Sequence, residues 1–129
     1  MFQHSIQPRF CETDALGHIN HAVVPTWFEE GRIGIFRIFN PSLSMESWNL
    51  ILKRFEIEFF HQIWQQHPVT IETEIEKVGN TSLIVLQRVI QQENICAAGR
   101  TVLVHFDYEA QKPAPIPEAI RAELEAHLV

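Results

Sequence analysis

The stretch ETDALGHINHAVVPTWFEEGR, residues 12–32, joins a short polar segment to the start of an apolar helical pattern. The polar part, residues 12–21, holds the carboxylate of Asp14 together with two imidazoles and an amide. Helical periodicity follows from about Ala22. A helix N-terminus carries unpaired N–H donors and a partial positive charge, and carbonyl chemistry needs such donors where negative charge develops on oxygen. The stretch therefore predicts an active site.

The helical pattern predicts one long helix over residues 22–39, which Pro41 ends. Its apolar stripe has the spacing of a single helical face and consists of Trp27, Phe28, Gly31, Gly34, Ile35, Ile38 and Phe39. A glycine costs about 1 kcal/mol relative to alanine in a helix, so two glycines on the buried stripe indicate a helix backbone lying close against a sheet. A proline is tolerated only in the first helical turn, so Pro25 places the helix start at Ala22 or slightly later.

Strands are predicted where apolar and polar residues alternate or where β-branched residues dominate. The predicted strands are residues 4–11, 50–60, 69–76, 83–91 and 95–108, with turns at 79–82 and 92–94. The connector KPAPIP at 112–117 precedes a terminal helix from Pro117 to about His127. One apolar helix and long antiparallel strands predict a single α+β domain over residues 1–129, with a curved sheet wrapped around the helix.

Composition excludes several classes of function. The chain has 129 residues and a formal net charge of −6, without a long basic run, which argues against nucleic-acid binding. Its two cysteines form no CxxC spacing and no disulfide framework. The N-terminus has no apolar signal-peptide core, and no apolar run reaches the roughly 20 residues that span a membrane. These features predict a protein of the cytoplasm.

The site stretch resembles the signature of the 4-hydroxybenzoyl-CoA thioesterase family of hotdog-fold proteins. The matching residues are Asp14, Gly17, His18, Asn20 and the segment Trp27, Phe28, Glu29. The strand KRFEIEF, the segment VTIETEIEKVGNTSL and the strand AAGRTVLVHFD are also similar to their family counterparts. The chain departs from the family at Val24 and Pro25, where Tyr-Leu is frequent, and at the neutral Asn80 and Thr81, where some members carry basic residues for the CoA phosphates.

The resemblance implies a hotdog fold and hydrolysis of an acyl-CoA or acyl carrier protein thioester without metal or redox cofactor. It also implies a homodimer or a dimer of dimers, with the site between subunits. Asp14 is then the nucleophile or the general base. His18 and His21 are the other catalytic candidates, and Gly17, Asn20, Thr81 and Lys112 are the candidates for substrate binding.

Alternatives remain for most of these residues. Asp14 and Asn20 also suit a turn, and His18 and His21 suit backbone-bonded loop histidines or, together with an acid, a metal site. The N–H groups of residues 21–24 are expected to be free to polarise a carbonyl, and Gly17 is expected to need a positive φ or a close approach to substrate.

A hotdog dehydratase or hydratase, and a non-catalytic binding protein for acyl thioesters, remain alternatives to a thioesterase. Neither a GxSxG elbow, a P-loop nor a dinucleotide-binding fingerprint occurs in the chain.

Overall fold

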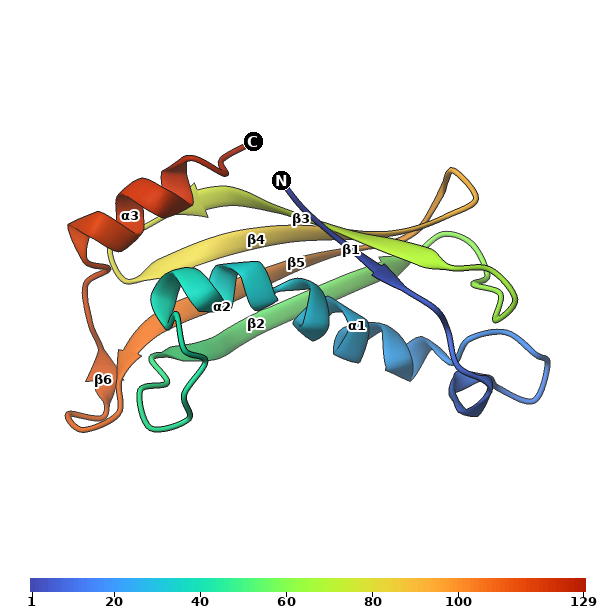
Figure 1. Cartoon of the computed structure of the whole chain (residues 1–129), viewed down its shortest axis with the longest axis horizontal. Coiled ribbons are helices and arrows are strands. Elements are labelled where there is room, and N and C mark those ends of the chain that lie inside the picture. Colours follow the sequence, from blue (N-terminus) through green and yellow to red (C-terminus); the bar gives the residue numbers. More distant parts are fainter.

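The computed structural model describes all residues, 1–129, as a curved antiparallel sheet that wraps two short consecutive helices (Figure 1). The strands are β1 (Phe2–Ile6), β2 (Leu50–Phe59), β3 (Val69–Val78), β4 (Ser82–Gln91), β5 (Asn94–Asp107) and β6 (Lys112–Pro113). The helices are the 3₁₀ turns η1 (Phe10–Glu12) and η2 (His21–Val23), followed by α1 (Val24–Gly31), α2 (Ile33–Phe39) and α3 (Glu118–Glu125). The predicted α+β architecture is confirmed.

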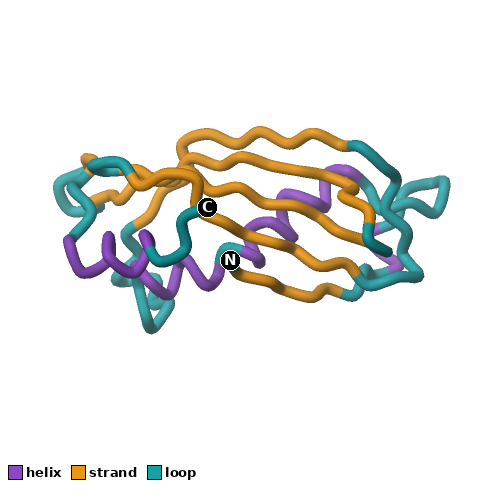
Figure 2. The backbone as a smooth tube through the Cα atoms, turned by 90° about the horizontal axis from the view of Figure 1, so that it is seen from above, coloured by secondary structure: helices purple, strands orange, loops and turns teal.

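The strand order in the sheet is β1-β3-β4-β5-β2, and β6 pairs with β5. Figure 2 shows the strands side by side, with the helices crossing one face. Two buried apolar clusters fill the space between the layers. One lies under α1 around Phe28, and the other lies under α2 around Ile35. No helix of the chain has the length and apolar character needed to cross a membrane.

The first predicted strand, residues 4–11, is wrong in its bounds. β1 ends at Ile6, and the chain turns into η1 at Phe10. Pro8 has no N–H to donate to a ladder, and the Glu12 carboxylate captures the N–H of Arg9 at 2.7 Å. The chain therefore leaves the sheet before residue 8. The terminal helix is likewise shorter than predicted and runs from Glu118 to Glu125.

The predicted single helix over 22–39 is also corrected. The 3₁₀ turn η2 precedes α1, and Arg32, with ψ of 0°, separates α1 from α2. The Arg32 side chain is buried and donates to Gln87 at 3.1 Å, while Gln87 donates to the Phe28 carbonyl oxygen at 2.8 Å. Burial lowers the pKa of the Arg32 guanidinium. Pro25 lies in the first turn of α1, as predicted.

The close contact expected between the helix and the sheet is confirmed. A Cβ added at Gly31 would lie 2.6 Å from the Ile71 Cγ2 atom of β3, and one added at Gly34 would lie 2.5 Å from the Phe2 ring of β1. Side chains at these two positions would force the helices away from the sheet.

Gly31→Ala is therefore expected to lower the free energy of unfolding by about 1–2 kcal/mol, although alanine is intrinsically the better helix former. Chemical denaturation at one fixed protein concentration measures the change. Thr26→Ala, at an exposed position of the same helix, serves as the control. A Gly31→Ala protein that is as stable as wild type would contradict the close contact.

Candidate functional site

The polar loop between η1 and η2 folds back on itself and is fastened at its base. The N–H of Asn20 donates to the Glu12 carbonyl oxygen at 2.8 Å, and the N–H of Asp14 donates to the His18 carbonyl oxygen at 2.7 Å. Gly17 lies at the tip with φ of +83°, which is the first of the two possibilities that the sequence left open, a positive φ or a close approach to substrate. No atom lies within 4 Å of a Cβ added there, so glycine is required by the backbone conformation rather than by space.

The two oxygens of the Asp14 carboxylate have different hydrogen-bond partners. Oδ1 accepts hydrogen bonds from the N–H groups of Leu16 at 2.8 Å and His18 at 3.2 Å, which makes it the organising acceptor of the loop. Oδ2 accepts no hydrogen bond from the chain. One carboxylate thus builds the turn and also keeps an oxygen free for chemistry.

The start of the helix leaves one free donor. Asn20 caps the turn, because its Oδ1 accepts the N–H of Ala22 at 2.9 Å and its carbonyl oxygen accepts the N–H of Val23 at 2.9 Å. The N–H of Val24 donates to the His21 carbonyl oxygen. The expectation of free N–H groups at residues 21–24 is therefore corrected to the N–H of His21 alone. The extra 3₁₀ turn ahead of α1 uses the other three.

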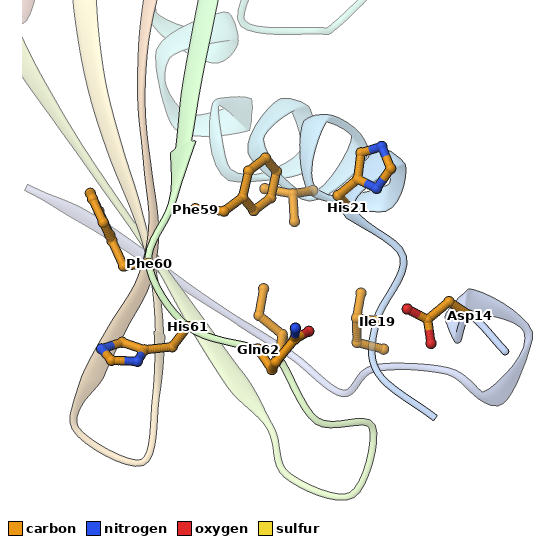
Figure 3. A pocket seen from close by; sticks show the side chains of 9 residues that line it. Asp14, Ile19, His21, Phe59, Phe60, His61 and Gln62 are labelled. Carbon is orange, nitrogen blue, oxygen red and sulfur yellow. The ribbon is translucent and has the colours of Figure 1, made fainter. Parts of the chain in front are cut away.

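Asp14 and His21 border one cavity of about 650 Å³, within the range of small-molecule sites. Its lining consists of Asp14, Ile19, His21, Val24, Phe59, Phe60, His61, Gln62 and Ile63. Figure 3 shows Asp14 and His21 on the loop and helix side, the Phe59 ring across from His21 at the end of β2, and the Phe60 ring pointing away beyond the strand. The His21 ring stands edge-on to Phe59, with 6.2 Å between centroids. The site therefore pairs a carboxylate and a free N–H with an apolar wall.

The His18 side chain does not line this cavity. Its ring stands edge-on to Trp64, with 4.5 Å between centroids, and its buried Nδ1 has no partner. Its N–H, rather than its imidazole, contacts Asp14. No group of three or more His, Cys, Asp or Glu side chains in the chain could hold a metal ion.

The strand β6, which contains Lys112, and the turn between β3 and β4, which contains Thr81, lie at the opposite end of the sheet from the loop between β1 and α1, which contains Asp14 (Figure 1). Thr81 follows β3, and Lys112 is exposed in the short strand β6. Thr81 lines a separate cavity of about 320 Å³ that also contains Lys53, the extra residue of a bulge in β2. Within one chain, these two candidates are not brought together with the others.

Sequence reasoning missed the two phenylalanines that line the cavity of Asp14. The sequence pattern places Phe59 and Phe60 at the end of a strand, and the two residues are 46% and 51% exposed. Two consecutive phenylalanines at a strand end are a signal that could have marked them, because only one of the two can face the core. The role of Glu12, which is buried beside the loop, also went unnoticed.

Comparisons with known proteins agree with this architecture. A family model described as the thioesterase-like superfamily matches residues 8–124. A solved structure of a predicted thioesterase from Bacillus stearothermophilus is 42% identical, with a TM-score of 0.98, over 99% of this chain and 96% of that one. A thioesterase from Thermus thermophilus, solved with coenzyme A and Zn, is 29% identical, with a TM-score of 0.86, over 95% and 96%. The acyl-CoA thioester hydrolase YbgC of Escherichia coli O6:H1 is 25% identical over 95% of both chains. The predicted hotdog fold is confirmed.

Proposed function

The chain belongs to the thioesterase-like superfamily, and on that premise we propose that it hydrolyses acyl-CoA thioesters, with Asp14 and the N–H of His21 as the reacting groups of the protein. One observation carries the assignment of residues. The only carboxylate on the 650 Å³ cavity has a free oxygen, and the only unpaired N–H among residues 21–24 belongs to His21, another lining residue of that cavity. YbgC, which is named for acyl-CoA thioester hydrolysis, supports the choice of substrate.

The thioester carbonyl oxygen accepts a hydrogen bond from the N–H of His21, which stabilises the negative charge that develops during attack. Asp14 Oδ2 then acts in one of two ways. As a nucleophile it forms an anhydride with the acyl carbon while the C–S bond breaks and CoA leaves as a thiolate, and water later cleaves the anhydride. As a general base it takes a proton from a water molecule that attacks the carbonyl carbon directly. Both routes yield the free acid and CoA, and neither needs a cofactor.

His18 then contributes through its backbone, since its N–H holds Asp14 Oδ1 while its ring packs on Trp64. Gly17 and Asn20 shape the loop and the helix start in this proposal. The acyl group faces Phe59, whose ring stands edge-on to His21.

The open edge of β2 supports a homodimer. β2 ends the sheet, so one of its sides has unpaired N–H and C=O groups, and it carries exposed apolar side chains at Ile51 and Leu52. Antiparallel pairing of two β2 strands around a two-fold axis reverses one chain relative to the other. Thr81 and Lys112 of the partner subunit then come toward the Asp14 end, where they are placed to meet the CoA portion of the substrate.

The expected mass in sedimentation at micromolar concentration is therefore a multiple of the 15.0 kDa chain, either a dimer or a dimer of dimers. An exposed sheet edge with apolar side chains is a strong driver of association. A species of 15.0 kDa under these conditions would reject the shared site.

The test of function is a panel of acyl-CoA thioesters of different chain length and aromaticity, with detection of the released thiol. Release of CoA by wild type, and its loss in Asp14→Asn, is the expected result. Thiol release distinguishes hydrolysis from a dehydratase or hydratase, which leaves the thioester bond intact, and from a protein that only binds. No thiol release from any substrate would overturn the proposal.

A further inference from the structure

Glu12 is a buried carboxylate that does not line the cavity of Asp14. It is 8% exposed, and burying a charge is unfavourable unless partners compensate for the lost hydration. Its Oε1 accepts the N–H of Arg9 at 2.7 Å, and its Oε2 accepts the indole N–H of Trp27 at 3.1 Å. The Arg9 guanidinium lies 3.6 Å from Oε2. The carboxylate is thus fully engaged by structural partners.

These contacts connect three segments of chain. The Glu12 side chain bonds to α1 through the buried Trp27, and its carbonyl oxygen accepts the N–H of Asn20, which closes the loop. Asp14 comes two residues after Glu12 in the chain, and His21 comes one residue after Asn20. Both reacting groups of the proposed function are therefore tied to the same buried residue.

The direction of the Glu12 side chain separates its role from that of Asp14. Glu12 borders a different cavity of about 340 Å³, together with Arg9, Thr13 and Asn20. Asp14 and His21 face the other cavity. Glu12 therefore lies behind the loop, away from the cavity of Asp14.

We propose that Glu12 is a positioning residue, which holds the Asp14 loop against α1 so that Asp14 Oδ2 and the N–H of His21 face the same carbonyl group. The inference rests on the proposed function for its kinetic consequences. Its structural part, fixation of the loop by the Glu12–Trp27 contact, stands independently of any activity.

The experiment compares Glu12→Gln, Trp27→Phe and the double variant. A glutamine has one acceptor oxygen in place of two, so it can satisfy only one of the two donors, and phenylalanine removes the indole donor. Each single variant is expected to lower kcat about tenfold while KM changes less than about twofold, because a misplacement of about 1 Å can cost about a hundredfold. The double variant is expected to be no slower than the worse single variant, since both changes break one contact.

Thr73→Val is the matched control. Thr73 is buried under the same helix and donates to the Gly31 carbonyl oxygen at 3.1 Å, away from the loop. It is expected to lower the melting temperature without lowering kcat. If Glu12→Gln also lowers only the melting temperature, Glu12 is merely structural and the inference is wrong.

Two further readouts complete the test. The acid limb of the pH profile of kcat/KM is expected to stay in place in Glu12→Gln, and its disappearance would show that Glu12 is itself the titrating base, against the inference. Hydrogen exchange is expected to become faster at the amide of Asn20 in Glu12→Gln but not in Thr73→Val, and equal exchange in both would overturn the inference. This last measurement decides the positioning role even if wild type releases no CoA, a result that would reject the proposed function alone.

Discussion

His21→Pro is expected to reduce kcat about a hundredfold or more relative to His21→Ala, since one donor to a developing oxyanion is worth about that much. The two variants lose the same imidazole, but only proline also removes the backbone N–H. The local backbone suits proline. His21 is the first residue of η2, where a missing N–H disturbs no helical bond, and Asn20 has ψ of 130°, a conformation that residues before proline adopt.

Steady-state kinetics on the best acyl-CoA substrate, together with the melting temperature, would measure this effect. Both variants are expected to melt near the wild-type temperature, because the other bonds of the turn do not involve the His21 N–H. Equal kcat in His21→Pro and His21→Ala, with both proteins folded, would remove the N–H of His21 from the mechanism. A large loss that is already present in His21→Ala, and that His21→Pro does not increase, would assign the role to the imidazole instead.

Asp14→Asn is expected to lower kcat by about a hundredfold or more, the usual scale for loss of a catalytic acid–base group. The substitution tests the charged oxygen alone, because an asparagine Oδ1 can still accept hydrogen bonds from the N–H groups of Leu16 and His18 that organise the loop. Only the free Oδ2 is replaced by an amide nitrogen. The melting temperature and KM are therefore expected to change little.

Glu29→Gln is the control for charge near the site. Glu29 is exposed on α1 and does not line the cavity of Asp14, so its loss is expected to leave kcat within about twofold of wild type, as surface substitutions generally do little. Near-wild-type turnover in Asp14→Asn would refute the assignment of Asp14. A loss of kcat in Glu29→Gln as large as that in Asp14→Asn would assign a catalytic role to Glu29 on α1.

Interactions between residues close in the sequence allowed much of the fold to be predicted from the sequence. Alternation along β3 and the β-branched residues of β4 predicted strands whose inner residues, such as Ile71 and Val85, are fully buried. The position of Pro25 predicted the start of the helix to within two residues, because a proline is tolerated only in the first helical turn. Gly17 was expected to have a positive φ or a close approach to substrate, and its φ is +83°.

Other features depend on residues that are distant in the sequence, and no local pattern encodes them. The helix breaks at Arg32, whose buried side chain meets Gln87 on β4, 55 positions later. His18 turns toward Trp64 rather than toward the cavity of Asp14 because the loop after β2 passes beside it. The residue type of His18 was visible in the sequence, but the direction of its ring was decided by that loop.

Propensity, periodicity and capping act within a few residues, so they predicted the type of the elements, the carboxylate at the loop and the polar start of the helix. Which groups face one cavity depends instead on the packing of segments that are distant in the sequence. This packing left Asp14 Oδ2 and the N–H of His21 without internal partners and set Phe59 across from them. It also put the β3–β4 turn with Thr81 and the strand β6 with Lys112 at the far end of the sheet. The physical reason is that hydrogen-bond satisfaction and packing are settled between segments, after the curved sheet has brought them together.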